Sequence, residues 1–223
     1  MPKRSQPGYD DVMPVRSWQI LSGLAVSGFL LALPGGLLPL WGYHVSGAFG
    51  VAGNYFLALG AGLTCGSVLA VKLRAKYALE QLLATGCFAG ALVLLLLTFA
   101  QPPASPWYQA FVLLVAGAAS GTINRTVFET LAPAYEANRA GVMLSAGGFF
   151  GAGSFLSAYL LADCLDSSSP ARWFAVAAVA LAGAGFLLGR LRLAVAAVNV
   201  LPAGEATRDL RSVLAILFAL LRV

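Results

Sequence analysis

The sequence predicts an all-α polytopic membrane protein, and three observations support this prediction. Hydrophobic residues make up 59% of the 223 residues and charged residues only 10%, whereas a soluble domain carries roughly 45–50% and about 25%. Six runs of about 20 apolar residues, the length that crosses a bilayer, follow one another along the chain. Glycine occurs 25 times, and it is more frequent in membrane helices than in soluble ones.

Short polar or proline-bearing loops such as QPPASP and DCLDSSSP separate the apolar runs. We therefore expect six transmembrane helices near residues 18–41, 50–71, 77–100, 107–131, 140–162 and 172–190. The first run is longer than the roughly 7–15-residue core of a signal peptide, so it is interpreted as a retained span.

The segments outside the spans are also assigned from composition. Residues 1–17 are polar and form an N-terminal tail, and the six-helix bundle extends over residues 18–193. Residues 194–209 contain Pro202 and Gly204 and are interpreted as a linker. Residues 210–223 are apolar over too short a length to cross a bilayer of roughly 30 Å. They predict the start of a truncated seventh span.

Lysine and arginine are distributed unevenly between the two sides of the predicted bundle. With the N-terminus inside, the outer loops contain only Arg172, and the cytoplasmic segments contain Lys3, Arg4, Arg16, Lys72, Arg74, Lys76, Arg139, Arg190, Arg192, Arg208 and Arg211. Because positive charge accumulates on the cytoplasmic side of membrane proteins, this predicts a cytoplasmic N-terminus in the cell (inner) membrane. The net charge of +5 is thus explained by topology, and we expect no nucleic-acid partner.

No cofactor or metal site is expected. Cys65, Cys87 and Cys164 are scattered along the chain and form no metal-binding spacing. An intramembrane serine protease would need Ser120 near a histidine, but His44, the only histidine, is expected at the opposite membrane face. The chain is therefore not expected to be an enzyme.

The turn between the second and third spans reads GSVLAVKLRAK, from Gly66 to Lys76. With six spans, an inside N-terminus and a longer linker after the sixth span, this turn resembles the N-terminal half of a major facilitator superfamily (MFS) transporter, which contains a 3+3 repeat. Gly66, Lys72, Arg74 and Lys76 match the family's cytoplasmic loop motif in kind. Ala70 and Leu73 replace its acidic residue and its second glycine, so the family's acidic lock is not expected in this form.

Two further segments resemble the fucose-permease type of sugar/proton symporter within that family. They are LPLWGYH at the end of the first span and GTIN in the fourth. The resemblance implies a carboxylate on the fourth span that takes part in proton coupling. Aligning the glycine places Asn124 at that position, so the resemblance leaves proton coupling open.

The fourth span carries an arginine and a glutamate inside its apolar run. Arg125 and Glu129 are spaced i, i+4, so they can pair on one helix face. Gly117, Gly121, Asn124 and Phe128 fall on a neighbouring stripe. Two interpretations stay open: a structural or snorkelling ion pair near the cytoplasmic edge, or a role in a cavity or gate.

The first span ends in a segment with unusual backbone chemistry. Pro34, Gly35, Gly36 and Pro39 predict a helix kink that frees backbone carbonyls, either for a binding site or for packing alone. Beyond it lie Trp41, Tyr43 and His44, which are expected at the outer membrane boundary. Trp41 and His44 are also candidates for a cavity or gate, and a proton relay is the alternative role for His44.

The second and fifth spans contain small residues four apart. Gly62 and Gly66 in one, and Gly147 and Gly151 in the other, predict close helix contacts within the bundle. Asn54 and Tyr55, near the outer end of the second span, are further candidates for a cavity.

These expectations favour a secondary transporter that moves a small solute by alternating access, and that forms the N-terminal half of a larger unit. Its partners would be the lipid bilayer, the solute, and either a missing C-terminal half or a second copy. A structural or channel-like membrane subunit is the alternative, with an intramembrane enzyme less favoured.

Overall fold

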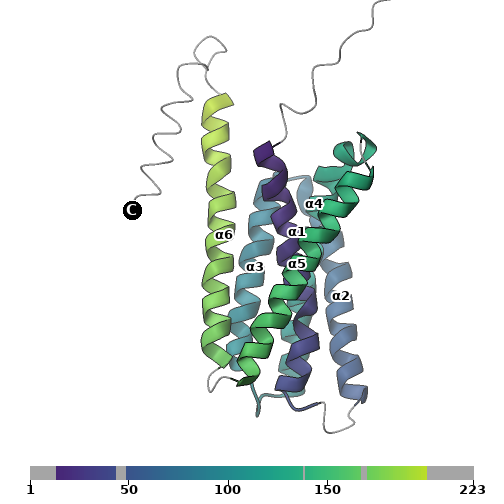
Figure 1. Ribbon diagram of the computed structural model, residues 1–223, viewed down its shortest axis with the longest axis vertical. Coiled ribbons are helices and arrows are strands. Elements are labelled where there is room, and N and C mark those ends of the chain that lie inside the picture. The colour runs from purple at the N-terminus through teal and green to yellow at the C-terminus, as the bar shows by residue number, and fades with distance from the viewer. Residues whose placement is uncertain (1–13, 44–48, 138, 167–169, 200–223) are drawn as a thin grey trace, which may run out of the picture.

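The computed structural model describes residues 14–43, 49–137, 139–166 and 170–199, and the regular structure within these ranges is entirely helical. Its helices lie side by side along one long axis (Figure 1). In chain order they are α1 (Pro14–Leu40), α2 (Phe49–Arg74), α3 (Leu79–Phe99), α4 (Pro106–Ala137), α5 (Arg139–Asp166) and α6 (Pro170–Asn199). The predicted tail, linker and seventh span lie outside the described residues, apart from the ends that α1 and α6 include.

Each apolar run expected from the sequence lies on a helix of its own. Five helices, α1 to α5, are long and apolar enough to cross a membrane. The apolar stretch of α6 is shorter among the described side chains, Ala171–Phe186. A multi-pass helical membrane protein is therefore confirmed, whereas the sixth crossing stays a prediction.

The helices continue beyond the apolar runs. The fourth run was expected to end at residue 131, but α4 extends to Ala137 and contains 32 residues. At about 1.5 Å per residue it is longer than the roughly 30 Å hydrocarbon core. The backbone hydrogen bonds of α4 thus continue beyond its apolar run and past the hydrocarbon core.

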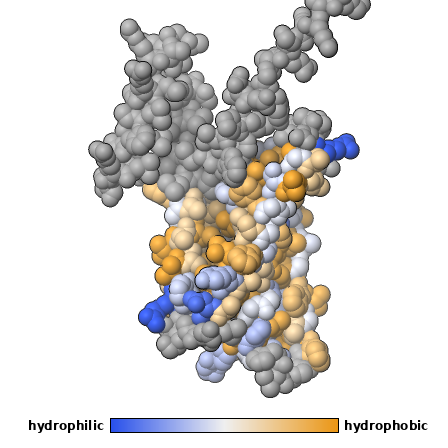
Figure 2. Space-filling view, in the orientation of Figure 1, coloured by the Kyte–Doolittle hydropathy of each residue, from blue (hydrophilic) through white to orange (hydrophobic). Residues whose placement is uncertain are grey.

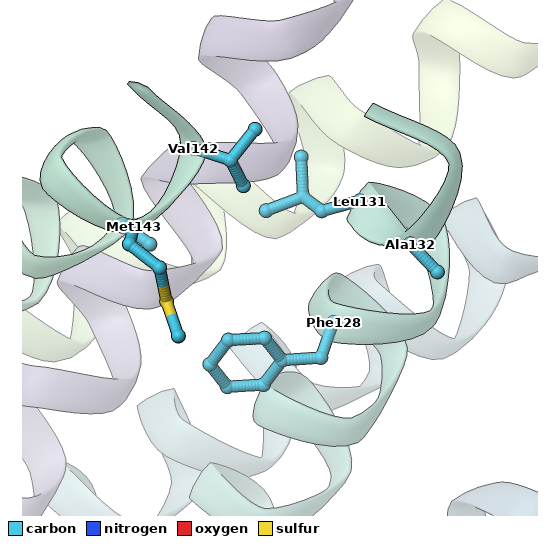
Figure 3. Close-up of a pocket in the computed structure, with 6 residues that line it drawn as sticks. Phe128, Leu131, Ala132, Val142 and Met143 are labelled. Carbon is cyan, nitrogen blue, oxygen red and sulfur yellow. The ribbon is translucent and has the colours of Figure 1, made fainter. Parts of the chain in front are cut away.

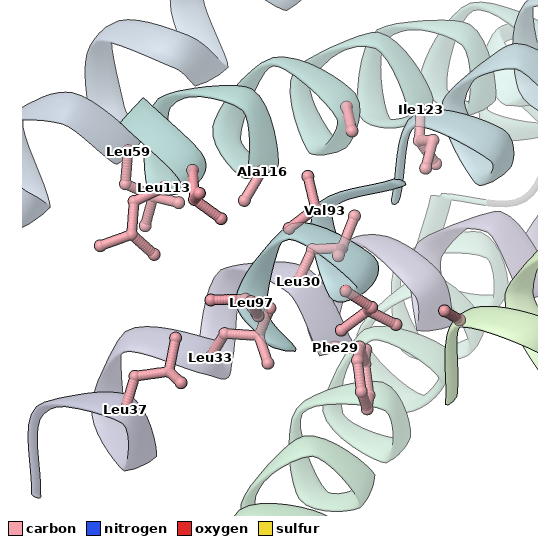
Figure 4. Packing of buried hydrophobic residues seen from close by; sticks show 14 of the residues in the cluster. Phe29, Leu30, Leu33, Leu37, Leu59, Val93, Leu97, Leu113, Ala116 and Ile123 are labelled. Carbon is pink, nitrogen blue, oxygen red and sulfur yellow. The ribbon is translucent and has the colours of Figure 1, made fainter. Parts of the chain in front are cut away.

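Three helix pairs make the most extensive contacts: α2 with α4, α1 with α5, and α3 with α6. Figure 1 shows α6 beside α3 at one edge and α5 crossing α1. Between these pairs, leucine, isoleucine and valine side chains form one core, in which Leu30, Leu33, Leu97, Leu113 and Ile123 are almost fully buried (Figure 4). Helices α1 and α4 lie at the centre of this core.

The outer surface is apolar as well. On the face shown in Figure 2, hydrophobic side chains cover most of the helical part and strongly hydrophilic ones lie near its two ends. Trp107 is 84% exposed and Phe99 is 75% exposed. A soluble protein would not present large apolar side chains along whole helices, whereas lipid solvates them well.

Helices α2 and α4 touch backbone to backbone. A Cβ atom on Gly66 would lie 2.0 Å from the carbonyl oxygen of Ala118, and one on Gly121 would lie 2.1 Å from that of Leu63. The Ser67 hydroxyl adds hydrogen bonds to the carbonyl oxygens of Leu63 (2.9 Å) and Gly121 (3.3 Å). Only glycine permits this approach, which increases dispersion contact between the helices in lipid.

Helices α1 and α5 repeat this arrangement with different residues. A Cβ on Gly153 would lie 1.8 Å from the carbonyl oxygen of Ala25, and one on Gly28 would lie 2.1 Å from that of Phe150. Ser154 donates to the carbonyl oxygens of Phe150 (3.1 Å) and Gly28 (3.2 Å). The contacts correspond when α1 is matched with α4 and α2 with α5.

The glycine contacts expected on the fifth span were assigned to the wrong residues. Gly62 and Gly66 pack against α4 as predicted, but a Cβ on Gly147 or Gly151 would meet nothing within 4 Å. The close contact of α5 is made by Gly153. Ser154 and Leu161 lie on the same face of α5, which is turned to α1.

Helix α1 continues through Pro34 and ends at Leu40, with both prolines inside it, and the kink predicted at Pro34–Pro39 stays a prediction. Pro39 lies in its last turn, where the helix ends in any case. Gly36 packs closely against the Leu161 side chain, whereas Gly35 faces open space. The described backbone therefore continues as helix where a broken binding segment was considered.

We predict that Gly121→Ala lowers the free energy of unfolding by about 1–3 kcal/mol, because the new methyl group overlaps a backbone oxygen that cannot move aside. The matched control is Gly147→Ala, where open space surrounds the new methyl group and alanine favours the helix by about 1 kcal/mol. Thermal unfolding in detergent micelles measures both variants. Equal melting temperatures for the two variants would contradict the backbone contact.

Candidate functional site

A three-residue ion cluster lies at the end of the bundle where α2 ends and α3 begins, which we call the basic end. The carboxylate of Glu129 on α4 accepts from Arg125 Nε at 2.6 Å through one oxygen. Its other oxygen accepts from Arg74 Nη1, on the last turn of α2. The Glu129 side chain is 14% exposed, and those of Arg74 and Arg125 are 51% and 49% exposed. We call Arg74, Arg125 and Glu129 the ion triad.

The ion triad joins two of the sequence-derived predictions. The pair between Arg125 and Glu129 is present as their spacing indicated, and Arg74 was a candidate only as part of the loop motif. Sequence reasoning missed the link because Arg74 and Glu129 are 55 residues apart. The triad carries two positive charges and one negative charge, so one positive charge is not neutralised within it.

Asn124 lies beside the triad and has an unusual side chain. Its Oδ1 atom is buried and has no hydrogen-bond partner among the described residues. A buried amide oxygen without a partner costs about 1–3 kcal/mol. The described residues thus leave a hydrogen-bond acceptor of Asn124 unused, next to charged groups and inside an apolar span.

An apolar pocket of about 210 Å³ opens next to these residues, between α4 and α5 (Figure 3). In Figure 3, Phe128 of α4 and Met143 of α5 extend toward the same space. The remaining lining residues are Leu131, Ala132, Val142 and Ala146. Phe128 follows Asn124 by four residues and Arg125 by three, so the polar pair and the pocket share one face of α4.

A second polar cluster lies at the opposite end of the bundle. The Tyr55 hydroxyl donates to Gln109 Oε1 at 2.5 Å and lies 2.9 Å from the Tyr43 hydroxyl. Gln109 Nε2 donates to the carbonyl oxygen of Ala100 at 3.0 Å. The rings of Trp41 and Tyr43 each meet Tyr55 edge-on, with centroids 5.4 and 5.5 Å away. We call Trp41, Tyr43, Tyr55 and Gln109 the aromatic cluster.

The aromatic cluster contains Trp41, whose predicted place at the outer membrane boundary stays a prediction. Trp41 is buried at 6% exposure, so its side chain packs against protein neighbours. Its Nε1 atom has no hydrogen-bond partner within the described ranges. Gln109 was not a candidate, although an amide inside an apolar span is itself a signal, since a buried amide needs partners.

The centre of the bundle contains a serine pair. The hydroxyl oxygens of Ser27 on α1 and Ser120 on α4 are 2.5 Å apart and fully buried. Each serine precedes the glycine that touches the neighbouring helix, Gly28 or Gly121. The pair therefore joins α1 and α4 at corresponding positions, and it occupies the one serine considered for an enzyme.

The other candidate residues do not join these clusters. Asn54 is exposed on α2, next to the buried Tyr55, and Lys72 and Lys76 are exposed at the basic end. His44 lies outside the described residues. No group of three or more His, Cys, Asp or Glu residues that could hold a metal occurs in the described part of the chain.

No family model matches the chain, and comparison with curated proteins and with solved structures also found no match. The residues of the site are therefore the evidence for its chemistry. They provide a cationic group, a buried hydrogen-bond acceptor and an apolar pocket on one side of α4.

We predict that Arg74 and Glu129 are energetically coupled by about 1 kcal/mol, a modest value because the arginine is half exposed. A double-mutant cycle of Arg74→Gln and Glu129→Gln, followed by thermal unfolding in detergent, measures this coupling. Lys72→Gln is the matched control, because it removes a positive charge from the same turn but leaves the ion pair. Coupling of Glu129 to Lys72 as large as its coupling to Arg74 would show a general charge effect.

We also predict that Tyr55→Phe destabilises the protein by about 1–3 kcal/mol, because it removes the donor to the buried Gln109 Oε1. Tyr43→Phe keeps this donor and should have a smaller effect. The two melting temperatures, measured under the same detergent conditions, decide the point. A larger loss for Tyr43→Phe would contradict the hydrogen bonding described.

Proposed function

We propose that the protein is a secondary transporter of the major facilitator type, which moves a small solute across the membrane by alternating access, and that its six helices correspond to the N-terminal half of such a transporter. One observation carries the proposal: α1 to α3 and α4 to α6 behave as two copies of one three-helix unit. Transporters of this kind contain such units in inverted orientation.

The repeat rests on matched contacts. The serine pair and the two glycine contacts support a correspondence of Ser27 and Gly28 on α1 with Ser120 and Gly121 on α4. Gly66 and Ser67 on α2 correspond to Gly153 and Ser154 on α5, with the same acceptors on the facing helix. Because consecutive helices alternate in direction, α1 and α4 run in opposite directions (Figure 1). The two units are thus related by inversion of topology.

The packing suits a unit that moves as a rigid body. The ion triad holds the basic end of α2 against α4, and the glycine contacts hold the same helices at mid-height. At the matching position of the other pair, at the opposite end, Gly36 of α1 meets Leu161 of α5. One end of the unit is closed by charge and the other by apolar contact, while α2 and α5 remain the least buried of the five long helices.

A solute path requires a second unit that faces this one. The broad exposed faces of α2 and α5 provide the surface for it, and the second unit is either a further six-helix half or another copy of the chain. The basic end lies in the cytoplasm in this proposal, as the distribution of lysine and arginine indicates. The membrane is then the cell (inner) membrane.

Alternating access can be tested by labelling single cysteines from the two membrane sides. Gly35 on α1 and Phe128 on α4 occupy corresponding positions of the repeat, at opposite ends of the bundle, and both are exposed. We predict that a transported solute changes the labelling of Gly35→Cys and Phe128→Cys by a membrane-impermeant maleimide in opposite directions. A panel of sugars, organic acids and amphipathic drugs supplies the solutes, and right-side-out and inside-out vesicles give access to each side.

The control for this experiment is Ser105→Cys in the α3–α4 loop, whose labelling should be independent of solute. Reciprocal changes at the two positions, together with uptake of the same solute into vesicles, support the transporter. Constant labelling with a solute-independent ion current would instead indicate a channel-like subunit. Constant labelling without any flux would indicate a structural subunit.

A further inference from the structure

We propose that the pocket between α4 and α5, together with Asn124 and Arg125, binds an amphipathic organic anion, with its charged group at Arg125 and its apolar part in the pocket. The assignment of this anion as the transported class of solute rests on the proposed function. The binding itself is inferred from the residues of this chain alone and does not require transport.

The charge of the ion triad is the first argument. Two guanidinium groups share one carboxylate, so an uncompensated positive charge remains at the edge of the apolar stretch Pro106–Ala132, which contains Arg125 and Glu129. Arg125 pairs with Glu129 through Nε and its side chain remains 49% exposed, and a guanidinium also carries two terminal amino groups that can donate. A guanidinium fork binds carboxylate or phosphate through such groups. An anion would both neutralise the charge and engage these donors.

The pocket defines the rest of the ligand. Its six lining side chains are all apolar, so it offers nothing to the hydroxyl groups of a sugar. A volume of about 210 Å³ is below the roughly 300–1,000 Å³ of pockets that enclose drug-sized ligands. It therefore suits a short hydrocarbon or aromatic group attached to the anion. This favours organic anions over the sugars that the fucose-permease resemblance implied.

The order of the polar and apolar parts distinguishes a solute from an anionic lipid. Asn124 and Arg125 lie one helical turn closer to the middle of the α4 span than Phe128, and Leu131 and Ala132 lie further toward the basic end. A phospholipid has the reverse order, with its charged group at the membrane surface and its chains toward the middle. A solute that enters along α4 can place its anionic group first.

Asn124 provides an additional recognition group. Its buried Oδ1 atom lacks a hydrogen-bond donor among the described residues, while an amide also carries two N–H donors. A carboxylate that bridges the Asn124 amide and the Arg125 fork would have partners on both oxygens. A hydroxyl or amine on the ligand could donate to Oδ1.

The test is binding of a matched pair of probes to the full chain in non-ionic detergent. Octanoate and octanamide have nearly the same shape and differ in charge. We expect octanoate to bind about tenfold or more tightly than octanamide, as a charge-assisted hydrogen bond provides. Isothermal titration with a micelle-only blank gives both affinities, and acetate tests the need for the apolar part.

Variants separate the two halves of the site. Arg125→Gln should reduce octanoate binding to the level of octanamide, and Arg125→Lys should restore part of the difference. Met143→Trp should fill the pocket and weaken both probes. The controls are Lys72→Gln for charge and Leu144→Trp for size, since Leu144 is 80% exposed and does not line the pocket. Gel filtration and circular dichroism verify that each variant is folded.

Three results would overturn the inference. They are equal binding of octanoate and octanamide, unchanged octanoate binding in a folded Met143→Trp variant, and binding of short-chain dihexanoyl phosphatidylglycerol without binding of octanoate. The last result would assign the site to an anionic lipid. Failure of these binding tests would leave the cysteine-labelling test of transport untouched, and failure of that test would leave the anion site standing.

Discussion

The backbone contacts at four glycines, Gly28, Gly66, Gly121 and Gly153, are the constraint on which the arrangement of the helices depends. Lipid offers no hydrophobic advantage for helix association, so the bundle must be held by close packing and by hydrogen bonds between helices. The glycines supply the first, since carbonyl oxygens lie where their side chains would begin. Ser67 and Ser154 supply the second from the adjacent position. Both devices fix the same two helix pairs.

The position of the polar residues follows from this packing. With α2 fixed against α4 at mid-height, the last turn of α2 comes to lie beside Glu129, and Arg74 can reach it. The same geometry in the α1–α5 pair brings Gly36 to Leu161, where no charge needs a partner. The two ends of the bundle therefore differ in chemistry although their backbones correspond. At the basic end, a charge in an apolar span is tolerated because two oppositely charged neighbours are held next to it.

Hydropathy predicted the helices well, because a span must be apolar over its full length and the signal is local. The pair of Arg125 and Glu129 was also predictable, since i, i+4 neighbours meet on any helix. The contacts of Arg74, Gln109 and Ser27 depend on which helices are adjacent, and no local sequence pattern predicts this.

Gly147 and Gly151 show most clearly the limit of predicting helix contacts from residue spacing. Their spacing equals that of Gly62 and Gly66, yet they lie on an open face of α5. The repeat itself consists of Ser-Gly and Gly-Ser pairs, too short to be noticed before their contacts were known.

The two copies of the repeat are unequal in a way that bears on how a site could operate. On α1, the positions that correspond to Asn124, Arg125 and Phe128 are Leu31, Ala32 and Gly35. Of these two sets, only the α4 set contains polar groups, while the α1 set is apolar and a Cβ on Gly35 would meet nothing within 4 Å. In the proposed transporter, a ligand held by α4 would keep its partners when the unit rocks, because the ion triad and the glycine contacts would move with that helix. In that proposal, rocking would change the access on either side, and Gly35 would provide room at the end where α4 carries no bulky charged group. A scaffold of two matching helix pairs with a recognition site on only one of them would thus separate binding from gating.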